Sequence, residues 1–466
     1  MPDRDHRDHR DDLDTWLRRG IDPLPPPPGT FEAIRRRARR RKYRRLAVSA
    51  GAALVVVAAA VTVPQVVRLP IEKAQTEAGP SAVSPTTPRP AKTGTSGVEA
   101  SSLAPVPLPA GDPVPPDFQP ASVTAVSQAT IFTIGQAGTP GHCATAYCTS
   151  VARSQDGGAT WAGLPAPVTG PPDGASGVGQ IRFLEGVNGW AFGPELWATH
   201  DGAKHWTRIG THGRRVTDVE TVGARAFAIE ATCTGTGQDF AAQCTSFTLY
   251  STTAKAGAWT KVGPATTNLT TEDGGTGAAS LVLTGTRGYL LGPDGTLYSG
   301  PVDGSAAWSA AGKIPCATGQ AQPDGAPAGA LLGAVTGQNL LLACAQAPAG
   351  TTQAKQVYVS SDGGRAWQMM WVAPTAGIAT SIAASPSNTV VLATSEGIEV
   401  LPANATTWQP ASLAAQAPAT GFGFVGMTTD LDGMALPADT AAGTVWFTTD
   451  GGLIWTPHPV QSAQGT

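Results

Sequence analysis

An eleven-residue frame recurs along this chain and restricts its fold more than any other feature. The last copy is Val445–Trp455 (VWFTTDGGLIW), and related copies are Val357–Trp367, Val151–Trp161 and Leu196–Trp206. Each copy begins with apolar and aromatic residues, which suit a half-buried strand. An Asp-Gly turn follows, which is a hairpin signal, and a tryptophan then opens the next strand. The frame therefore predicts antiparallel strands joined by a tight turn.

The spacing of the copies predicts how many sheets there are. Two copies lack the aspartate, with Ala254 before Trp259 and Ala403 before Trp408, and the seven tryptophans are separated by 45, 53, 49, 59, 41 and 47 residues. A step near 50 residues corresponds to one four-stranded blade. We therefore predict an all-β, seven-bladed β-propeller of four-stranded antiparallel blades over residues 121–466. Five copies keep the aspartate: Asp156 and Trp161, Asp201 and Trp206, Asp303 and Trp308, Asp362 and Trp367, Asp450 and Trp455.

The turn sequences resemble a known repeat. Ser154–Trp161 matches the pattern Ser/Thr-x-Asp-x-Gly-x-Thr-Trp of the Asp-box (BNR) repeat throughout, and Ser360–Trp367 and Thr448–Trp455 depart from it only at the Thr. The run Asn188–Gly193 is similar to blades of photosystem II assembly and stability factor-like propellers. The resemblance implies that each Asp box is a structural turn between the third and fourth strands of a blade. The aspartates and tryptophans would then be scaffold residues.

The N-terminal region predicts a membrane anchor. Leu46–Val63 has no charge, and the apolar run continues to Val67, which is long enough to span a bilayer. Nine of the eleven residues of Arg35–Arg45 are Lys or Arg, which would hold residues 1–45 in the cytoplasm and bind anionic lipid. We expect a single-pass signal-anchor helix over residues 46–67 in a bacterial cell membrane. The alternative is a cleaved signal peptide, although such peptides have a much shorter n-region.

Between anchor and propeller, residues 68–120 are rich in Pro, Ala, Ser and Thr, which predicts a disordered linker that is either an extended tether or a passive stalk. Charge is divided unevenly along the chain. Residues 1–45 have a net charge of +6 and the remainder has a net charge of −9. An acidic body argues against nucleic acid as a partner, because nucleic acid needs a basic face.

All six cysteines lie in the part expected outside the membrane. An even number of cysteines in an exported domain indicates disulfides, and proximity favours the pairs Cys143–Cys148, Cys233–Cys244 and Cys316–Cys344. A structural zinc site is the alternative, but the spacings lack paired Cys-x-x-Cys units.

The longer loops predict a binding face. Gly135–Tyr147, Pro165–Gly179, Glu230–Gln243, Gly263–Gly277, Pro315–Gly329 and Ala345–Gln356 all join second to third or fourth to first strands, on the face away from the Asp boxes. Long loops on a rigid scaffold are where binding usually occurs, although they are also where insertions are tolerated. The ligand-face residues that we select are His142, Tyr147, Gln238 and Asp239.

Catalysis has little support in the sequence. Sialidase-like glycosidases have an Arg-Ile-Pro signature, an arginine triad and a paired Tyr and Glu, and this chain has no Arg-Ile-Pro. Tyr250, Tyr298 and Tyr358 occupy repeat-equivalent strand positions and are expected in the core. His200, His205 and His212 are close in sequence, but the first two belong to a turn, so we expect no metal, cofactor or catalytic residue.

We therefore expect a membrane-anchored extracytoplasmic module that binds a protein, peptide or glycan without catalysis. One alternative is an exo-acting, sialidase-like glycosidase, which requires an acidic pair and at least two arginines at the central channel. The other is a transmembrane sensor linked to a cytoplasmic regulator.

Overall fold

The computed structural model describes residue 108 and residues 110–137, 149–170, 177–233, 244–254, 257–267, 279–316 and 329–462. The chain divides into two units, Met1–Glu99 and Ala100–Thr466, and every described residue belongs to the second. The expected cytoplasmic arm, the membrane span over residues 46–67 and most of the linker lie outside the described residues. Within the described ranges, no helix has the length and apolar character needed to cross a bilayer.

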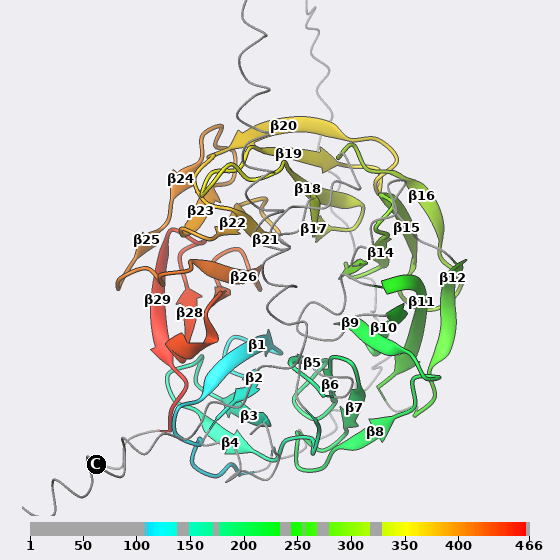
Figure 1. Ribbon diagram of the computed structural model, residues 1–466, viewed down its shortest axis with the longest axis vertical. Coiled ribbons are helices and arrows are strands. Elements are labelled where there is room, and N and C mark those ends of the chain that lie inside the picture. The colour runs from blue at the N-terminus through cyan, green and yellow to red at the C-terminus, as the bar shows by residue number, and fades with distance from the viewer. Residues whose placement is uncertain are drawn as a thin grey trace, which may run out of the picture. The chain divides into compact units, whose positions relative to one another are not determined.

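Seven sheets follow one another around a ring, which confirms the predicted seven-bladed propeller of four-stranded antiparallel blades (Figure 1). Strand bounds in blades 1 to 4 are β1 Gln119–Ala125, β2 Ile131–Gln136, β3 Thr149–Ser154, β4 Ala162–Leu164; β5 Gln180–Phe183, β6 Gly189–Phe192, β7 Leu196–Thr199, β8 Thr207–Ile209; β9 Arg215–Val222, β10 Arg225–Cys233, β11 Cys244–Thr253, β12 Thr260–Thr267; and β13 Ser280–Leu283, β14 Arg287–Leu291, β15 Thr296–Pro301, β16 Ser309–Lys313.

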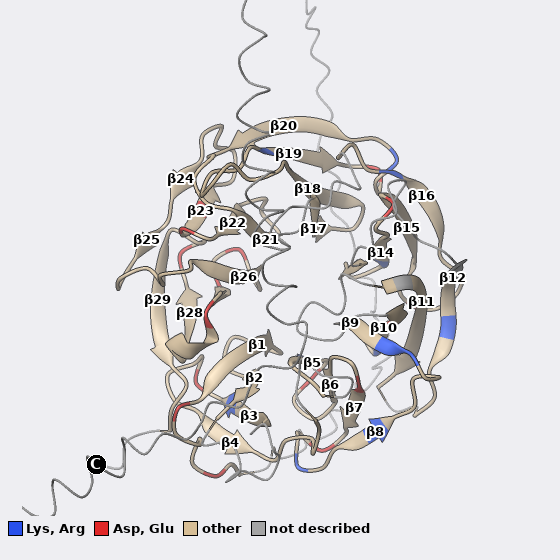
Figure 2. Cartoon of the chain, viewed as in Figure 1, with Lys and Arg blue, Asp and Glu red and all other residues tan. Residues whose placement is uncertain are grey.

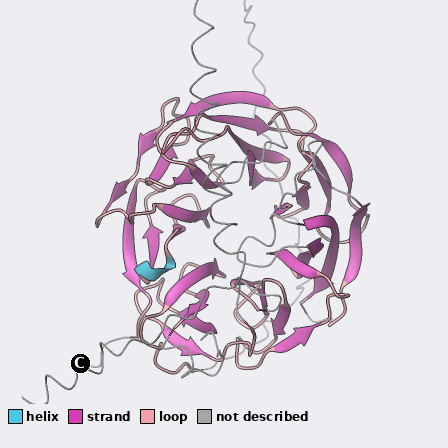
Figure 3. Ribbon diagram, viewed as in Figure 1, coloured by secondary structure: helices cyan, strands magenta, loops and turns pink. Residues whose placement is uncertain are grey.

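Strand bounds in blades 5 to 7 are β17 Gly329–Thr336, β18 Asn339–Ala345, β19 Lys355–Ser360, β20 Gln368–Ala373; β21 Ala379–Ala384, β22 Val390–Thr394, β23 Ile398–Leu401, β24 Gln409–Pro410; and β26 Phe422–Met427, β27 Gly433–Pro437, β28 Thr444–Thr448, β29 Ile454–Pro459. Each blade begins with its innermost strand and ends at the rim (Figure 1). Figure 3 shows strands throughout, with one short 3-10 helix, η2 (Thr440–Ala442), before β28.

The tryptophan spacing predicted the blades because each of the seven tryptophans stands at the start of a fourth strand. Trp161 directly precedes β4, Trp367 directly precedes β20, and Trp455 is the second residue of β29. The apolar faces of neighbouring blades then pack together. The stacked rings of Phe132 in blade 1 and Phe183 in blade 2, with centroids 3.7 Å apart, illustrate such a contact.

The ring closes without exchange of a strand, because both terminal blades are built from contiguous sequence. Blade 1 meets blade 7 through a buried cluster that includes Val123, Trp161 and Val445. The chain after β29 continues along blade 1, where the Trp161 N–H donates to the Gln461 carbonyl at 3.3 Å. Closure therefore depends on apolar packing and on a C-terminal tail rather than on a shared sheet.

The chain ahead of β1 also joins the body, within the stretch assigned to the linker by composition. Asp112 and Gly163 exchange two backbone hydrogen bonds of 2.9 and 2.7 Å, so this segment lies beside the outer strand β4. The Val114 N–H donates to Ser462 Oγ at 2.6 Å, and Phe118 is buried. The packed body therefore begins before residue 119.

One strand was not expected. Residues Ser412 and Leu413 form β25, which pairs in parallel with β29 and makes the sheet of blade 7 five-stranded. The Ser412 N–H donates to the Leu453 carbonyl at 2.8 Å, and the Ala414 N–H donates to the Trp455 carbonyl at 2.9 Å. The outer edge of blade 7 is thus occupied by chain that follows blade 6.

Candidate binding face

The two ends of the blades differ in which connections they carry. We call the end with the second-to-third and fourth-to-first connections the loop face, and the end with the first-to-second and third-to-fourth turns the turn face. Most of the long loops predicted for the loop face lie outside the described residues. His142, Tyr147, Gln238 and Asp239, and the pair Cys143 and Cys148, are among the residues not described.

The five aspartate turns connect third to fourth strands and lie on the turn face. In blade 5, Ser360 Oγ donates to Asp362 Oδ1 at 2.8 Å and accepts from the Gly364 N–H at 2.8 Å. The N–H groups of Arg365 and Ala366 both donate to Asp362 Oδ1 at 3.0 Å. Oδ1 of the carboxylate therefore accepts three hydrogen bonds from its own turn. Equivalent bonds join Ser154 to Asp156, Thr199 to Asp201 and Thr448 to Asp450.

Hydrogen bonding lowers the pKa of four of these aspartates, Asp156, Asp201, Asp303 and Asp362. The Ala366 N–H, followed by the Ser360 hydroxyl, lowers the pKa of Asp362 below its usual value. Burial alone would raise the pKa of Asp156, but hydrogen bonds from Thr160 and Ser154 outweigh that effect and the pKa is lowered. Such carboxylates are held ionised as acceptors, which suits a structural turn.

The second glycine of each Asp-Gly-Gly turn packs against the preceding blade. A β-carbon on Gly158 would lie 2.5 Å from the Phe447 ring of blade 7, and one on Gly452 would lie 2.7 Å from Val391 of blade 6. Both glycines have positive φ, +90° and +88°, which glycine adopts at little cost. In blade 2 this position is Ala203, which is fully buried at φ +71°. The aspartate turns thus link blades together.

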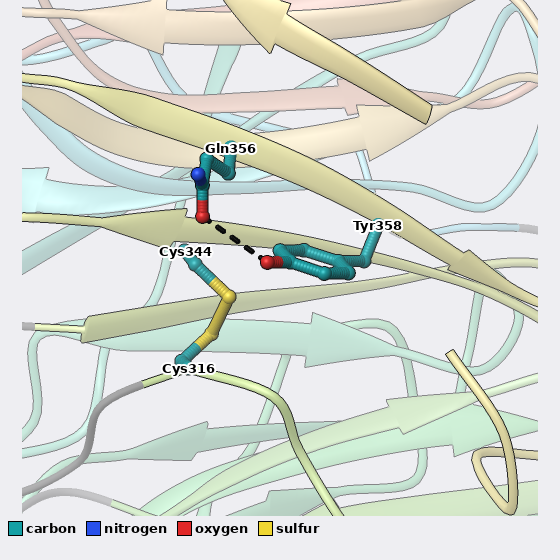
Figure 4. The surroundings of a disulfide bond; sticks show 4 residues. All are labelled: Cys316, Cys344, Gln356 and Tyr358. Carbon is teal, nitrogen blue, oxygen red and sulfur yellow. Dashed lines mark hydrogen bonds between the residues drawn. A yellow bond between two sulfur atoms is a disulfide. The ribbon is translucent and has the colours of Figure 1, made fainter. Parts of the chain in front are cut away.

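Two disulfides brace the opposite, loop face. Cys233 and Cys244 join the adjoining ends of β10 and β11, with Cα atoms 3.9 Å apart. Cys316, just after β16, is joined to Cys344 in β18, so this disulfide links blade 4 to blade 5. Figure 4 shows it beside Tyr358, whose hydroxyl donates to Gln356 Oε1 at 3.1 Å. Both are among the three expected pairs.

A polar cluster lies on the loop face where blade 2 meets blade 3. We call it the His212 cluster, and its members are His212, Arg214, Glu230, Thr248 and Tyr250. His212 Nδ1 is 3.2 Å from Glu230 Oε2, and the imidazole stacks on the Tyr250 ring with centroids 5.3 Å apart. Arg214 donates to the Thr248 hydroxyl at 2.5 Å. Two charged groups and an imidazole are thereby held together outside the apolar core.

Burial is unequal within this cluster. The Glu230 side chain is only 2% exposed, whereas the His212 side chain is 59% exposed. Burial raises the pKa of the Glu230 carboxyl, while His212 and Arg214 oppose that rise. Tyr250, expected in the core, is instead half-buried beneath the imidazole. A buried acid therefore supports a basic group that is open to solvent.

The other two histidines of the triplet have separate partners on the turn face. His200 Nδ1 is 2.7 Å from Asn188 Oδ1, and His205 Nδ1 is 2.7 Å from Asp201 Oδ2. In the described part of the chain, no three His, Cys, Asp or Glu side chains are grouped as a metal would require.

A second charged cluster lies on the innermost strands, where charged residues are otherwise sparse (Figure 2). Arg182 of β5 donates through Nε to Glu220 Oε1 of β9 at 3.0 Å. Asp218, two residues before Glu220, accepts from the Leu281 N–H of β13 at 3.0 Å. Burial, and then the neighbouring charge of Glu220, raises the pKa of Asp218 to about 7. Sequence reasoning did not select this group.

The inner strands repeat one hydrogen bond, and Asp218 belongs to that series. Ser122 Oγ accepts from the Ile181 N–H of the next blade at 3.2 Å, and Ser381 Oγ accepts from the Val425 N–H at 3.3 Å. Asp218 makes the same bond from blade 3 to blade 4. Its first role is therefore to fasten neighbouring blades.

Known proteins resemble this chain only distantly. No family model matches the sequence, and the search of curated proteins found no match. YCF48 from Cyanidioschyzon merolae is 16% identical, with 64% of this chain and 89% of that chain covered and a TM-score of 0.41. An ancestral GH74 enzyme is 14% identical, with 76% and 47% covered and a TM-score of 0.48. An α-L-arabinofuranosidase from Fusarium graminearum is 13% identical, with 73% and 96% covered and a TM-score of 0.37. These similarities concern the fold alone.

Proposed function

We propose that this chain is a membrane-anchored, extracytoplasmic binding module that presents its loop face to a protein, peptide or glycan and has no catalysis of its own. The observation that carries the proposal is that the two faces are built differently. On the turn face, Asp362 and Asp450 each accept backbone N–H groups of their own turns through Oδ1. The two described disulfides instead fix the ends of strands from which loop-face connections leave.

Such bracing favours recognition, because loops on a fixed scaffold lose less conformational entropy on binding. The connection between β18 and β19 shows how the loop face is ordered. Gln353 donates through Nε2 to the Gln346 carbonyl at 2.8 Å and accepts from the Ala379 N–H of blade 6 at 2.8 Å. Gln353 is 2% exposed, so this loop is anchored internally.

Hydrogen exchange on the purified full chain tests the proposal. Ligands are first selected from a glycan array and a peptide library, and amide exchange is then measured with and without each ligand. We expect protection in residues 210–214 and 345–354 on the loop face. The aspartate turns, residues 155–160 and 361–366, serve as the internal control and are expected to exchange unchanged. Protection confined to the aspartate turns would contradict the proposal, as would turnover of the ligand.

A second candidate, an exo-acting glycosidase, is favoured by the acidic pair Asp218 and Glu220 beside Arg182, since a carboxyl with a raised pKa suits a general acid. A second arginine, Arg215, lies on β9, the strand that carries Asp218 and Glu220. It lies five residues before Glu220, about 16 Å along an extended strand. Asp218→Asn would abolish hydrolysis in a glycosidase, while the binding proposal expects ligand affinity to be unchanged.

A further inference from the structure

We infer that His212 and Arg214 form a carboxylate-binding site whose affinity rises on protonation of His212. The inference rests on the proposed function, because it names the chemistry by which the loop face recognises its ligand. The first observation is a turn that includes His212. Its backbone conformation is unfavourable for a residue with a side chain, and it is not one of the aspartate turns.

The turn is Thr211–Arg214, closed by the Arg214 N–H donating to the Thr211 carbonyl at 2.8 Å. Its central residues have positive φ, +53° at His212 and +73° at Gly213. Positive φ is ordinary for glycine but uncommon for histidine, and strained residues persist where surrounding structure imposes them. Here the imposing contacts are the Glu230 carboxylate and the Tyr250 ring.

Those contacts fix the orientation of the imidazole and leave Nε2 as the ring nitrogen available to a ligand. With Nδ1 donating to Glu230, the neutral ring has Nε2 as an acceptor; after protonation, Nε2 becomes a donor. The ring is 59% exposed, so this change occurs at a surface that solutes reach. The contact with the buried Glu230 carboxylate holds the ring at a fixed orientation.

The charges around His212 set the sign of the ligand. Among the described residues, the titratable groups that face it are Glu230 from β10, Tyr250 from β11 and Arg214 from its own turn. The negative charge of Glu230 and the positive charge of Arg214 cancel while His212 is neutral. When His212 is protonated, these three groups together have one net positive charge. Protonation therefore adds attraction for an anion.

Arg214 selects among anions. One of its five N–H donors is used by the neutral Thr248 hydroxyl, and the planar guanidinium matches the two oxygens of a carboxylate. A carboxylate on a ligand can thus accept from Arg214 and from protonated His212 together. Two sources supply this group, a uronic-acid glycan and an acidic peptide, and the test includes both.

The test measures dissociation constants of the purified full chain for a uronic-acid oligosaccharide and an oligoglutamate peptide, at pH 5.5 and pH 8. Uncharged counterparts, the carboxyl-reduced oligosaccharide and oligoglutamine, control for the carboxylate. Imidazole side chains in general can gain a proton between pH 8 and pH 5.5. We expect one of the two acidic probes to bind about tenfold more tightly at pH 5.5.

Two variants and a matched control assign the effect. His212→Asn keeps a residue that tolerates positive φ and is expected to remove the pH dependence. Arg214→Gln is expected to weaken binding about tenfold or more at both pH values. His205→Asn removes another exposed histidine beside a carboxylate, but on the turn face, and should leave both constants unchanged. Thermal unfolding of each variant checks that the fold is kept.

Failure of this site and failure of the proposed function give different results. The inferred carboxylate site is wrong if neither acidic probe binds. It is also wrong if His212→Asn and Arg214→Gln leave the dissociation constants unchanged. Loop-face protection by some other ligand would then still support the proposed function. If His205→Asn weakens binding as much as His212→Asn does, the assignment to the loop face is also wrong.

Discussion

Gly364 packs so closely against Leu297 of the preceding blade that a β-carbon added to it would lie 2.1 Å from the leucine Cδ2. Gly364 also has φ +86°, a conformation that side chains with a β-carbon rarely adopt. We predict that Gly364→Ala lowers the free energy of unfolding by about 2–3 kcal/mol, through overpacking and backbone strain. Urea denaturation measures this loss. Gly363→Ala is the matched control, since it shares positive φ but meets its nearest atom at 3.3 Å. Equal losses in both variants would refute the role of the contact between blades.

The hydroxyl of Ser360 makes a second test of the aspartate turns. It is buried and accepts from the Gly364 N–H, so Ser360→Ala leaves that N–H without its acceptor. We predict a loss of about 1–3 kcal/mol in thermal or chemical unfolding. Ser360→Thr keeps the hydroxyl, as Thr199 and Thr448 do in blades 2 and 7, and should be close to the wild type. A threonine variant as unstable as the alanine variant would argue against the hydrogen bond.

Asp218 predicts an unusual pH dependence. Its folded pKa of about 7 lies above the ordinary value of 3.8, so the folded protein holds this proton more tightly than the unfolded chain. The contribution of Asp218 to stability therefore falls as pH rises from about 4 through 7. Asp218→Asn removes the charge and keeps an acceptor for the Leu281 N–H. We predict that the variant is more stable than the wild type by about 1–2 kcal/mol at pH 8, with little difference at pH 4. Chemical denaturation at both pH values would refute this if the asparagine variant were the less stable protein at pH 8.

The two disulfides should contribute unequally. Cys316–Cys344 closes a loop with a sequence separation of 28, against 11 for Cys233–Cys244. Loop-closure entropy then predicts losses of about 3.6 and about 2.8 kcal/mol when each pair is replaced by serine. Unfolding of the two double variants under oxidising conditions measures both. The larger loss is expected for the pair that joins blades 4 and 5, and the reverse order would contradict an entropic origin.

Local signals explain what the sequence predicted and what it missed. Tryptophans such as Trp161 and Trp367 begin fourth strands, so their spacing counts blades directly. Strand β25 has two residues, too few for any period, and its residues pair with residues of β29 that are 42 positions later. Its existence follows from tertiary packing alone.

The His212 cluster was missed for a related reason. His212, Glu230 and Tyr250 are separated by 18 and 20 residues, and the last was assigned to the core because it occupies a repeat-equivalent position. The fold brings a connection from blade 2 over the sheet of blade 3, which no periodicity encodes. One signal was present. Gly213 predicts a turn, and a turn would place the neighbouring His212 at the surface of the loop face. Arg182 and Glu220 likewise become partners only when β5 and β9 are neighbours.

The short pairing of Asp112 with Gly163 is the first backbone pairing that the chain entering the propeller makes in the part of the chain that the structure describes. Its two backbone hydrogen bonds lie at the rim of blade 1. The Val114 N–H bond to Ser462 and the buried Phe118 lie between these bonds and the six-pair ladder of β1 and β2. The segment ahead of β1 therefore adds a strand-like contact to the outer edge of blade 1 without belonging to any of the seven sheets.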